Sequence, residues 1–335
     1  MQKILVVGGC GYIGSHMVKC LVEKGCHVTI FDNLSTGHAD AVSPSTLIVG
    51  DLADKDLLDK TFVEGAFEVV MHFASSISVS ESVDNPALYY QNNVTNTQNL
   101  LDTMIHHDVN SFIFSSTAAI FGEPKYIPID ESHPKQPINP YGRTKWIVEQ
   151  MLGDYDKAYG LKSICLRYFN AAGADPGGAL GERHSPETHL IPLILQASSG
   201  KRDSITVFGR DYDTTDGTCV RDYIHVTDLC EAHWLAIQYL SRNRHCDQFN
   251  LGNNRGFSVQ EVINTARKIT GKSITINEGA RRNGDPAILV ADSCKAQKVL
   301  GWTPQYHDLE NIIKHAWQWE LNNENIKNEP KVRTT

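Results

Sequence analysis

Short, continuously apolar runs alternate with amphipathic stretches through the first half of the chain. The apolar runs occupy residues 4–7, 28–31, 46–49, 68–73, 111–115 and 163–167. Runs of this kind are typical of strands buried on both faces of a parallel sheet. Helical spacing of apolar residues predicts helices at 13–22, 57–62, 93–106 and 141–159. Because strand–helix–strand crossovers are right-handed, this order predicts a doubly wound α/β fold.

The pattern changes after residue 170. Residues 171–187 are rich in glycine, proline, alanine and charged side chains, which predicts a long loop, and such loops are often functional. Further on, the pattern predicts a strand at 204–208, a polar, frayed tail at 322–335, and helices at 190–198, 258–270 and 308–321. We expect residues 1–170 to form the doubly wound domain. Residues 171–335 are expected to form a smaller α/β lobe, with part of that chain returning to the first domain.

Composition excludes several classes of function. The 335 residues include 31 Lys and Arg against 39 Asp and Glu, and such an acidic balance disfavours nucleic acid as a partner. There is no apolar run of about 18 residues, so we expect no membrane-spanning helix, and the N-terminus lacks a signal-peptide pattern. The eight cysteines are scattered without a C-x-x-C pair, which is typical of reduced thiols in a cytoplasmic protein. None of the 14 histidines has a convincing ligand spacing, so we predict no metal site.

A glycine loop provides the first chemical signal. Gly8, Gly11 and Gly14 form a G-x-x-G-x-x-G motif between the first predicted strand and helix. Glycines there let the backbone approach a pyrophosphate, which the free amides at the helix N-terminus can bind. The alternative interpretation is a turn with packing glycines.

Acidic residues end the next two predicted strands. Asp32 is placed to accept hydrogen bonds from adenosine ribose hydroxyls, and no arginine follows it in residues 33–37. A 2′-phosphate would be repelled there, so the sequence favours NAD over NADP. Asp51 ends the third strand, where it could reach the adenine amine or serve only as a turn residue.

A tyrosine and a lysine provide the second signal. Tyr141 and Lys145 are spaced i, i+4 on a predicted helix, so both side chains lie on one face. An ammonium group close to a phenol favours the phenolate, which gives a base usable near neutral pH. Thr117 follows the fifth strand, where its hydroxyl could bridge a substrate oxygen and the tyrosine or could simply serve a turn.

Together these motifs resemble the extended short-chain dehydrogenase/reductase family, in particular its nucleotide-sugar epimerases. The resemblance covers nearly the whole chain, from residue 3 to about residue 321. Its most specific segments are residues 8–16, 32–34, 72–74, 89–94, 141–145, 167–170, 216–226 and 281–285.

The resemblance implies a role for each matching position. Tyr141 would remove the proton from the sugar 4-hydroxyl, Lys145 would hold the nicotinamide ribose and lower the tyrosine pKa, and Thr117 would bridge sugar and tyrosine. The implied NAD contacts are Gly8, Gly11, Tyr12, Ile13, Gly14, Asp32, Asn33, Leu34, Asp51, Leu52, Phe73, Ala74, Asn92, Lys145 and Phe169. The implied contacts to a UDP-hexose substrate are Thr117, Tyr141, Asn170, His189, Leu190, Phe208, Arg221, Arg282 and Asp285.

The resemblance also implies a mechanism and an assembly. Hydride would move from sugar C4 to NAD, the 4-keto sugar would swing about its diphosphate linkage, and the hydride would return to the other face. Since no net oxidation occurs, NAD should stay bound throughout turnover. A homodimer through helices 93–106 and 141–159 is implied as well.

Some positions depart from the family pattern. Ile77 replaces a lysine of certain members, Phe121 replaces a tyrosine, and His189 stands where some have asparagine. Leu289 lies where some members carry a bulky tyrosine facing the sugar, so N-acetylated hexoses are hypothesised as further substrates.

Other functions within the fold remain open. An epimerase for pentose or uronate sugars fits the same residues, as does a non-catalytic NAD-sensing protein. A 4,6-dehydratase is disfavoured, because Ala118 and Ala119 follow Thr117 where that chemistry needs an acid pair. No extra acid or base groups for a decarboxylase could be located.

Overall fold

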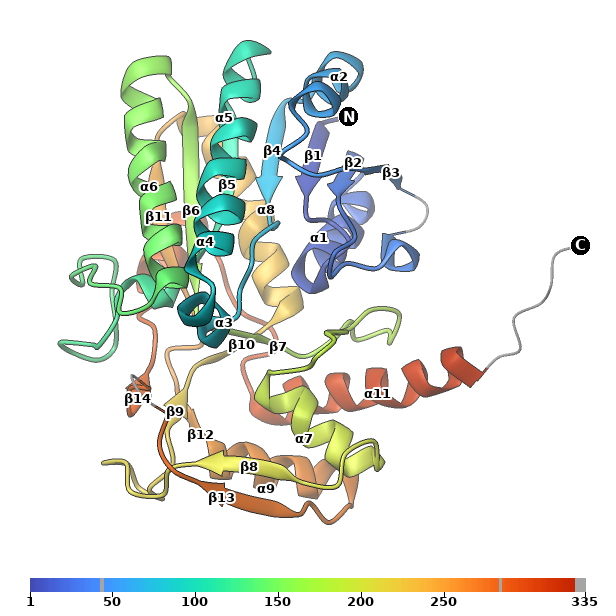
Figure 1. Ribbon diagram of the computed structural model, residues 1–335, viewed down its shortest axis with the longest axis vertical. Coiled ribbons are helices and arrows are strands. Elements are labelled where there is room, and N and C mark those ends of the chain that lie inside the picture. The colour runs from blue at the N-terminus through green and yellow to red at the C-terminus, as the bar shows by residue number, and fades with distance from the viewer. Residues whose placement is uncertain (43–44, 283–284, 329–335) are drawn as a thin grey trace, which may run out of the picture.

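A seven-stranded parallel sheet forms the larger part of the protein (Figure 1). The computed structural model describes residues 1–42, 45–282 and 285–328. The strand order is β11-β6-β5-β4-β1-β2-β3, and every neighbouring pair is parallel. The strands are β1 (Lys3–Val7), β2 (His27–Asp32), β3 (Thr46–Val49), β4 (Val69–His72), β5 (Ser111–Thr117), β6 (Lys162–Tyr168) and β11 (Asp247–Leu251). The predicted doubly wound fold is confirmed.

Helices cover both faces of this sheet. Successive side chains of a strand point to opposite faces, so Ile4 and Val6 of β1 join one apolar core while Leu5 and Val7 join the other. The first core is covered by α1 (Tyr12–Glu23), α8 (Val226–Asn243) and α10 (Cys294–Leu300). The second is covered by α2 (Lys55–Gly65), α5 (Asn96–His106) and α6 (Pro140–Tyr159).

Short helices follow β4 at the carboxyl edge of the sheet. They are α3 (Val79–Asp84), α4 (Pro86–Tyr89) and the π-helical segment η2 (Tyr90–Thr95). The 3-10 turns η1 (Ala39–Val42) and η3 (Ala118–Ile120) follow β2 and β5. These elements bring additional side chains to the edge where parallel strands end.

A smaller lobe lies beyond this edge (Figure 1). Its core packs α7 (Leu190–Ser199), α9 (Val259–Thr270) and α11 (Leu309–Asn328) against short strands. The short strands are β7 (Asn170–Ala172), β8 (Ile205–Phe208), β9 (Val220–Arg221), β10 (Tyr223–His225), β12 (Phe257–Ser258), β13 (Ile276–Gly279) and β14 (Ile288–Leu289). Ser258 and Glu261 form a capping box at the start of α9.

The full length of the last helix and the strand β11 were not predicted from the sequence. The last helix, predicted to end at residue 321, continues to Asn328, and residues 329–335 of the predicted tail lie outside the described residues. After leaving for the small lobe, the chain returns as α8 and β11, and β11 pairs with β6 at the edge of the large sheet. Among the described helices, none is long and apolar enough to cross a membrane.

Candidate functional site

The glycine loop forms a tight turn between β1 and α1. Gly8 has a φ of +79°, and a Cβ added there would lie 2.4 Å from the Ala74 backbone nitrogen. A Cβ on Gly14 would lie 2.1 Å from the Gly8 carbonyl oxygen. Gly11 is the N-cap of α1 with no side-chain cap, and the first helical turn carries no acidic residue. The free backbone amides at the start of α1 are therefore suited to binding an anion such as a pyrophosphate.

Acidic side chains at the ends of β2 and β3 continue this edge. Asp32 accepts hydrogen bonds from the backbone amides of Cys10 and Leu34, both at 2.8 Å. It thereby links the strand end to the glycine loop. Asn33 donates to Asp51 at 2.7 Å. Leu52, next to Asp51, is buried in the second core. The residues predicted to contact adenosine are thus brought together at neighbouring strand ends.

The remaining predicted cofactor contacts lie farther along the same edge. Phe73 and Ala74 follow β4, and the Phe73 ring lies beside the His233 ring in a tilted arrangement, with centroids 5.0 Å apart. Asn92 in η2 donates to the Ser76 hydroxyl at 3.1 Å. Phe169 follows β6 and packs against the small buried cluster Ala118, Ile120, Phe121 and Ile129. Tyr12 and Ile13 open α1 beside the glycine loop.

Thr117, Tyr141 and Lys145 lie together where β5 ends and α6 begins. The side chain of Asn139 caps α6 by accepting the Gly142 amide at 2.8 Å, which fixes the turn that carries Tyr141. Tyr141 and Thr117 share a side-chain hydrogen bond. The Lys145 ammonium donates to the Ser75 hydroxyl and the Ser115 carbonyl, both at 2.7 Å.

Burial controls the protonation of this group. It lowers the pKa of Lys145 to about 7, because this residue is only 2% exposed. Burial also raises the pKa of Tyr141, and the hydrogen bond with Thr117 opposes this effect. The expectation that Lys145 lowers the tyrosine pKa stays a prediction, because the causes that act on Tyr141 in the protein alone are burial and Thr117. The lysine instead bonds to Ser75 and Ser115.

A buried ion pair behind these residues was missed by the sequence analysis. Glu149 accepts from Arg167 at 2.9 and 2.5 Å, and also from the Ser116 hydroxyl at 2.5 Å. The two charged side chains are 4% and 1% exposed. They tie α6 to β5 and β6 directly behind Thr117 and Lys145. The spacing of Glu149, one helical turn after Lys145, was the available signal.

The predicted nucleotide contacts of the small lobe form two pairs. The Arg282 guanidinium lies over the Phe208 ring, 4.1 Å from its centroid. Arg221 donates to Asp285 and, at 2.8 Å, to the carbonyl of Val220. Residues 283 and 284 of the same predicted segment lie outside the described residues.

The other predicted substrate contacts join the lobes. Asn170 begins β7, and its amide donates to the Asp222 carbonyl at 3.1 Å. His189 is the N-cap of α7 and Leu190 is its first residue.

Leu289 in β14 packs against the cluster that contains Phe121. Ile77 is 46% exposed, so the missing family lysine leaves an exposed apolar side chain.

Residues 173–189 form an irregular segment, here called the strap, between β7 and α7. It corresponds to most of the predicted functional loop. The Gly173 carbonyl accepts from the Tyr12 hydroxyl at 2.7 Å, and Lys19 pairs with Asp175 at 2.5 Å. The Arg183 guanidinium forms two bonds of 2.9 Å with Asp40. The strap therefore crosses the glycine-loop edge and is fastened on both sides of it.

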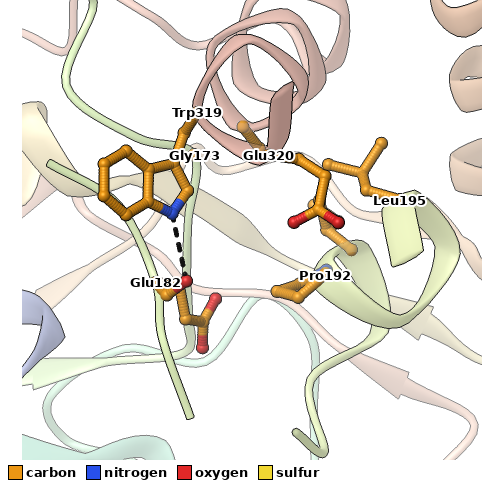
Figure 2. A pocket seen from close by; sticks show the side chains of 8 residues that line it. Gly173, Glu182, Pro192, Leu195, Trp319 and Glu320 are labelled. Atoms are coloured by element: carbon orange, nitrogen blue, oxygen red, sulfur yellow. Dashed lines mark hydrogen bonds between the residues drawn. The ribbon is translucent and has the colours of Figure 1, made fainter. Parts of the chain in front are cut away.

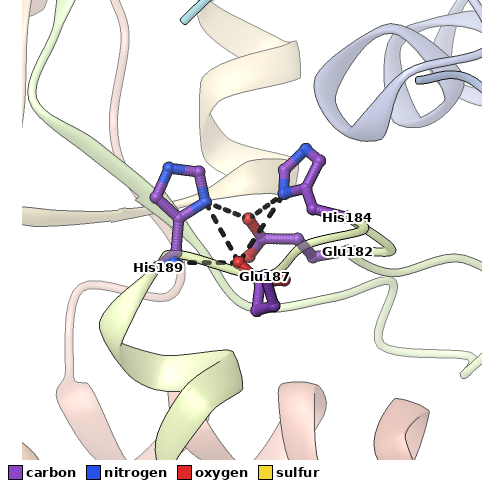
Figure 3. A group of neighbouring side chains, drawn as sticks. All are labelled: Glu182, His184, Glu187 and His189. Carbon is purple, nitrogen blue, oxygen red and sulfur yellow. Dashed lines mark hydrogen bonds and ion pairs between the residues drawn. The ribbon is translucent and has the colours of Figure 1, made fainter. Parts of the chain in front are cut away.

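Two other features occur where the strap meets the small lobe. A small pocket is lined by strap residues and by α7 and α11, and there the Trp319 indole donates to the Glu182 carbonyl at 3.2 Å (Figure 2). Beside it, two glutamates and two histidines converge: Glu182, His184, Glu187 and His189 (Figure 3). Burial disfavours the charged form of the His184 imidazole. Hydrogen bonds with Glu182 and Glu187 outweigh this effect and raise the pKa of His184 to about 10. This cluster was not singled out from the sequence.

Comparisons with known proteins agree on one family. The sequence profile of the NAD dependent epimerase/dehydratase family matches residues 4–252. A UDP-glucose 4-epimerase of Halalkalibacterium halodurans is 53% identical over 318 residues, which cover 95% of each chain. A crystal structure of UDP-glucose 4-epimerase from Brucella ovis in complex with NAD has a TM-score of 0.93 and 48% identity, covering 95% of this chain and 98% of that one. The UDP-Glc/GlcNAc 4-epimerase of Campylobacter jejuni has a TM-score of 0.84 and 42% identity, covering 96% and 100%.

Proposed function

We propose that the chain, which belongs to the NAD dependent epimerase/dehydratase family, interconverts UDP-glucose and UDP-galactose by inverting C4 of the hexose. The observation that carries the proposal is the group of Thr117, Tyr141 and buried Lys145 at the same sheet edge as the glycine loop. A proton-transfer group beside a dinucleotide cradle is what reversible oxidation of an alcohol requires.

NAD is the cofactor that these residues fit. Gly8 and Gly14 leave room for a close approach of the pyrophosphate, because a side chain at either position would meet backbone. Asp32 and Asp51 face the adenosine end at the neighbouring strand ends. When bound, NAD supplies the hydride acceptor that takes hydrogen from C4 and returns it. Residues 1–170 are thus proposed as the NAD-binding domain, and residues 171–335 as mainly the nucleotide-sugar lobe.

Tyr141 is proposed to hold the proton that leaves the sugar 4-hydroxyl. Its burial raises the pKa of Tyr141 and so disfavours the phenolate, while the hydrogen bond with Thr117 lowers that pKa. Thr117 also orients the sugar oxygen toward the phenol. Lys145 is held by Ser75 and Ser115 on the cofactor side of the tyrosine, where its ammonium can bond the nicotinamide ribose.

The small lobe is proposed to hold UDP firmly while the hexose turns. Arg221 and Arg282 supply guanidinium groups for the diphosphate, which they can bind in bidentate geometry. Phe208 offers an aromatic face for the uracil, and Asp285 an acceptor for the ribose. Asn170, His189 and Leu190 lie at the two ends of the strap, next to the expected position of the diphosphate.

A product analysis tests the proposal. The purified protein is incubated with UDP-glucose or UDP-galactose, and both reactions should converge on the same mixture by NMR. We expect Tyr141→Phe to fold and retain NAD while losing about 10²- to 10⁴-fold in rate, since it removes the proton acceptor. Tyr159→Phe, on the exposed end of the same helix, is the matched control and should remain active.

Several outcomes would contradict this proposal. Conversion of UDP-xylose or UDP-glucuronate but not of the hexoses would assign a pentose or uronate epimerase. Bound NAD without conversion of any sugar would indicate a sensing protein. Full activity of Tyr141→Phe would refute the assigned base.

N-acetylated UDP-hexoses are a second proposed substrate class. Leu289 is smaller than the tyrosine of some family members and lies among Phe121, Phe169 and their neighbours. We expect activity on UDP-N-acetylglucosamine from the wild type, and a selective loss in Leu289→Tyr with UDP-glucose turnover retained. Equal failure of the wild type and Leu289→Ala on the N-acetylated sugar would refute the idea.

A cytoplasmic homodimer through α5 and α6 is also proposed. Both helices lie on the same side of the sheet (Figure 1), and the Tyr155 hydroxyl bonds to Asp102 between them. Sedimentation velocity of the NAD-bound protein tests the assembly, and a single monomeric species at micromolar concentration would contradict it.

A further inference from the structure

Four side chains of the strap converge on one point at the start of α7. They are Glu182, His184, Glu187 and His189, and one ligand atom from each lies within 4.8 Å of the others (Figure 3). We propose that these residues form a binding site for a divalent transition-metal ion, with zinc as the best match. The site shares His189 with the proposed substrate contacts but is separate from Tyr141 and Lys145, and the inference does not depend on the proposed reaction.

The distances suit a four-coordinate ion. Nδ1 of His184 lies 3.0 Å from Oε1 of Glu182 and 3.8 Å from Oε1 of Glu187. Nδ1 of His189 bonds to the same Glu182 oxygen and lies 3.8 Å from Oε1 of Glu187. Zinc–ligand bonds of about 2.0–2.2 Å in a tetrahedron separate neighbouring ligands by about 3.3 Å. The observed separations bracket this value, so small side-chain movements can complete the coordination.

The donor set favours zinc over the harder cations. Imidazole nitrogens suit zinc and its neighbours in the first transition series, whereas calcium and magnesium prefer oxygen ligands alone. Two carboxylates and two neutral imidazoles carry a charge of −2, which a divalent ion balances. The carboxylates of Glu182 and Glu187 are only 5% and 4% exposed and pair with the imidazoles of His184 and His189, so a bound ion would take the place of the imidazole protons as their partner.

The surrounding contacts hold the ligands in place. The Glu187 carboxylate accepts from the backbone amides of Thr188 and His189 at 2.7 and 2.8 Å. The Glu182 carbonyl is held by the Trp319 indole of α11 (Figure 2), and a Cβ on Gly181 would lie 2.2 Å from that ring. Secondary contacts of this kind orient the ligands of metal sites.

A bound ion would fasten the strap to the small lobe. His189 is the N-cap of α7 and Glu182 contacts α11, so one ion would join the strap to two helices. The proposed role is therefore structural, because the reacting groups lie elsewhere.

A second cluster provides a matched control. Asp59, His106 and His107 also bring ligand atoms within 4.8 Å, but two of the three residues are exposed and only three ligands are present. Exposed Cys294 is a further place for adventitious zinc. Asp59→Asn and Cys294→Ser therefore test binding outside the proposed site.

The test measures zinc in the purified full-length protein carrying its NAD. After dialysis against a chelator and then chelator-free buffer, zinc chloride is titrated by calorimetry, and bound metal is counted by mass spectrometry after gel filtration. We expect one zinc per chain and a rise of several degrees in Tm. Glu182→Gln and His184→Gln should each weaken binding at least tenfold, while Asp59→Asn and Cys294→Ser should bind like the wild type.

Circular dichroism and NAD content confirm that each variant folds, and two variants are used so that a folding defect in one leaves the other informative. Absence of zinc from the wild type would overturn the proposal. Equal zinc in all variants, or loss of zinc in the control variants, would overturn it as well. Activity is measured in the same samples, so zinc without epimerisation refutes only the proposed function, and epimerisation without zinc refutes only this site.

Discussion

The carboxyl edge of the large sheet and the strap that crosses it are held by different kinds of contact. At the edge, positions are fixed by backbone packing at Gly8 and Gly14 and by the buried pair Glu149–Arg167. The strap is fastened to that edge by side chains such as Arg183, whose partner Asp40 is 65% exposed. Buried and backbone contacts cannot open without a large cost, whereas exposed ion pairs exchange with water at little cost. Groups that react are therefore held rigidly, whereas the Arg183 end of the segment over them is held by a contact that can be released.

Breaking the buried pair Glu149–Arg167 should cause the largest loss in the free energy of unfolding. Glu149→Gln leaves the Arg167 charge buried without its partner, so we expect a loss of about 3 kcal/mol or more in the free energy of unfolding. Urea titrations at a fixed NAD concentration measure it. Asp154→Asn, which breaks the exposed pair with Lys157 on the same helix, should leave the midpoint unchanged. A similar midpoint for both variants would contradict the rigid-edge interpretation.

Filling the glycine cradle should have the next largest effect. The added methyl group of Gly14→Ala meets the Gly8 carbonyl, and overpacking of this kind costs about 1–3 kcal/mol. We expect NAD to be bound about 10- to 100-fold more weakly, which fluorescence titration can measure. Gly153→Ala in α6 has nothing within 4 Å of the new Cβ and serves as the helical control. Unchanged NAD affinity in Gly14→Ala would show that the loop does not approach the cofactor.

Removing one hydroxyl should shift the pH dependence of the reaction. The hydrogen bond with Thr117 lowers a Tyr141 pKa that burial raises, so Thr117→Val should raise that pKa further. At a given pH the phenolate fraction then falls, and the rising limb of kcat/KM should move to higher pH. We expect about a tenfold loss near pH 7. Thr117→Ser retains the hydroxyl and should keep the wild-type profile; identical profiles for all three proteins would exclude this role.

Releasing the strap should have the smallest effect. Arg183→Gln removes an ion pair with an exposed partner, which stabilises by about 0.5 kcal/mol. We expect NAD to dissociate about two- to fivefold faster with little change in Tm. Lys60→Gln breaks the exposed pair with Glu64 in α2 and should not alter the dissociation rate. A loss of stability in Arg183→Gln as large as that of Glu149→Gln would remove the distinction between the two regions.

The parts that could be predicted from the sequence are those with local causes. Continuous apolar runs predicted β1 to β6, and the spacing of Tyr141 and Lys145 placed both on one helix. By contrast, β11 carries Asp247, Gln248 and Asn250 among its five residues, so its hydropathy does not indicate a strand.

Tertiary contacts account for the features that could not be predicted from the sequence. Asn250 is fully buried, and its side-chain amide donates to the Ile129 carbonyl at 2.9 Å. This hydrogen bond, which offsets the cost of burying the amide, joins segments far apart in the chain. Arg183 and Asp40 meet across 143 positions. The burial that raises the Tyr141 pKa likewise depends on the assembled fold, so it could not be predicted from the spacing of Tyr141 and Lys145.

The position of the strap between β7 and α7 has a consequence for the order in which the two ligands enter. The strap is fastened to Tyr12, Lys19 and Asp40 across the glycine-loop edge. If NAD binds at that edge as proposed, we expect it to enter before the strap is fastened. We then expect sugar nucleotides to arrive and depart while Arg183 and Asp40 stay paired, so that one loading event serves many successive substrates.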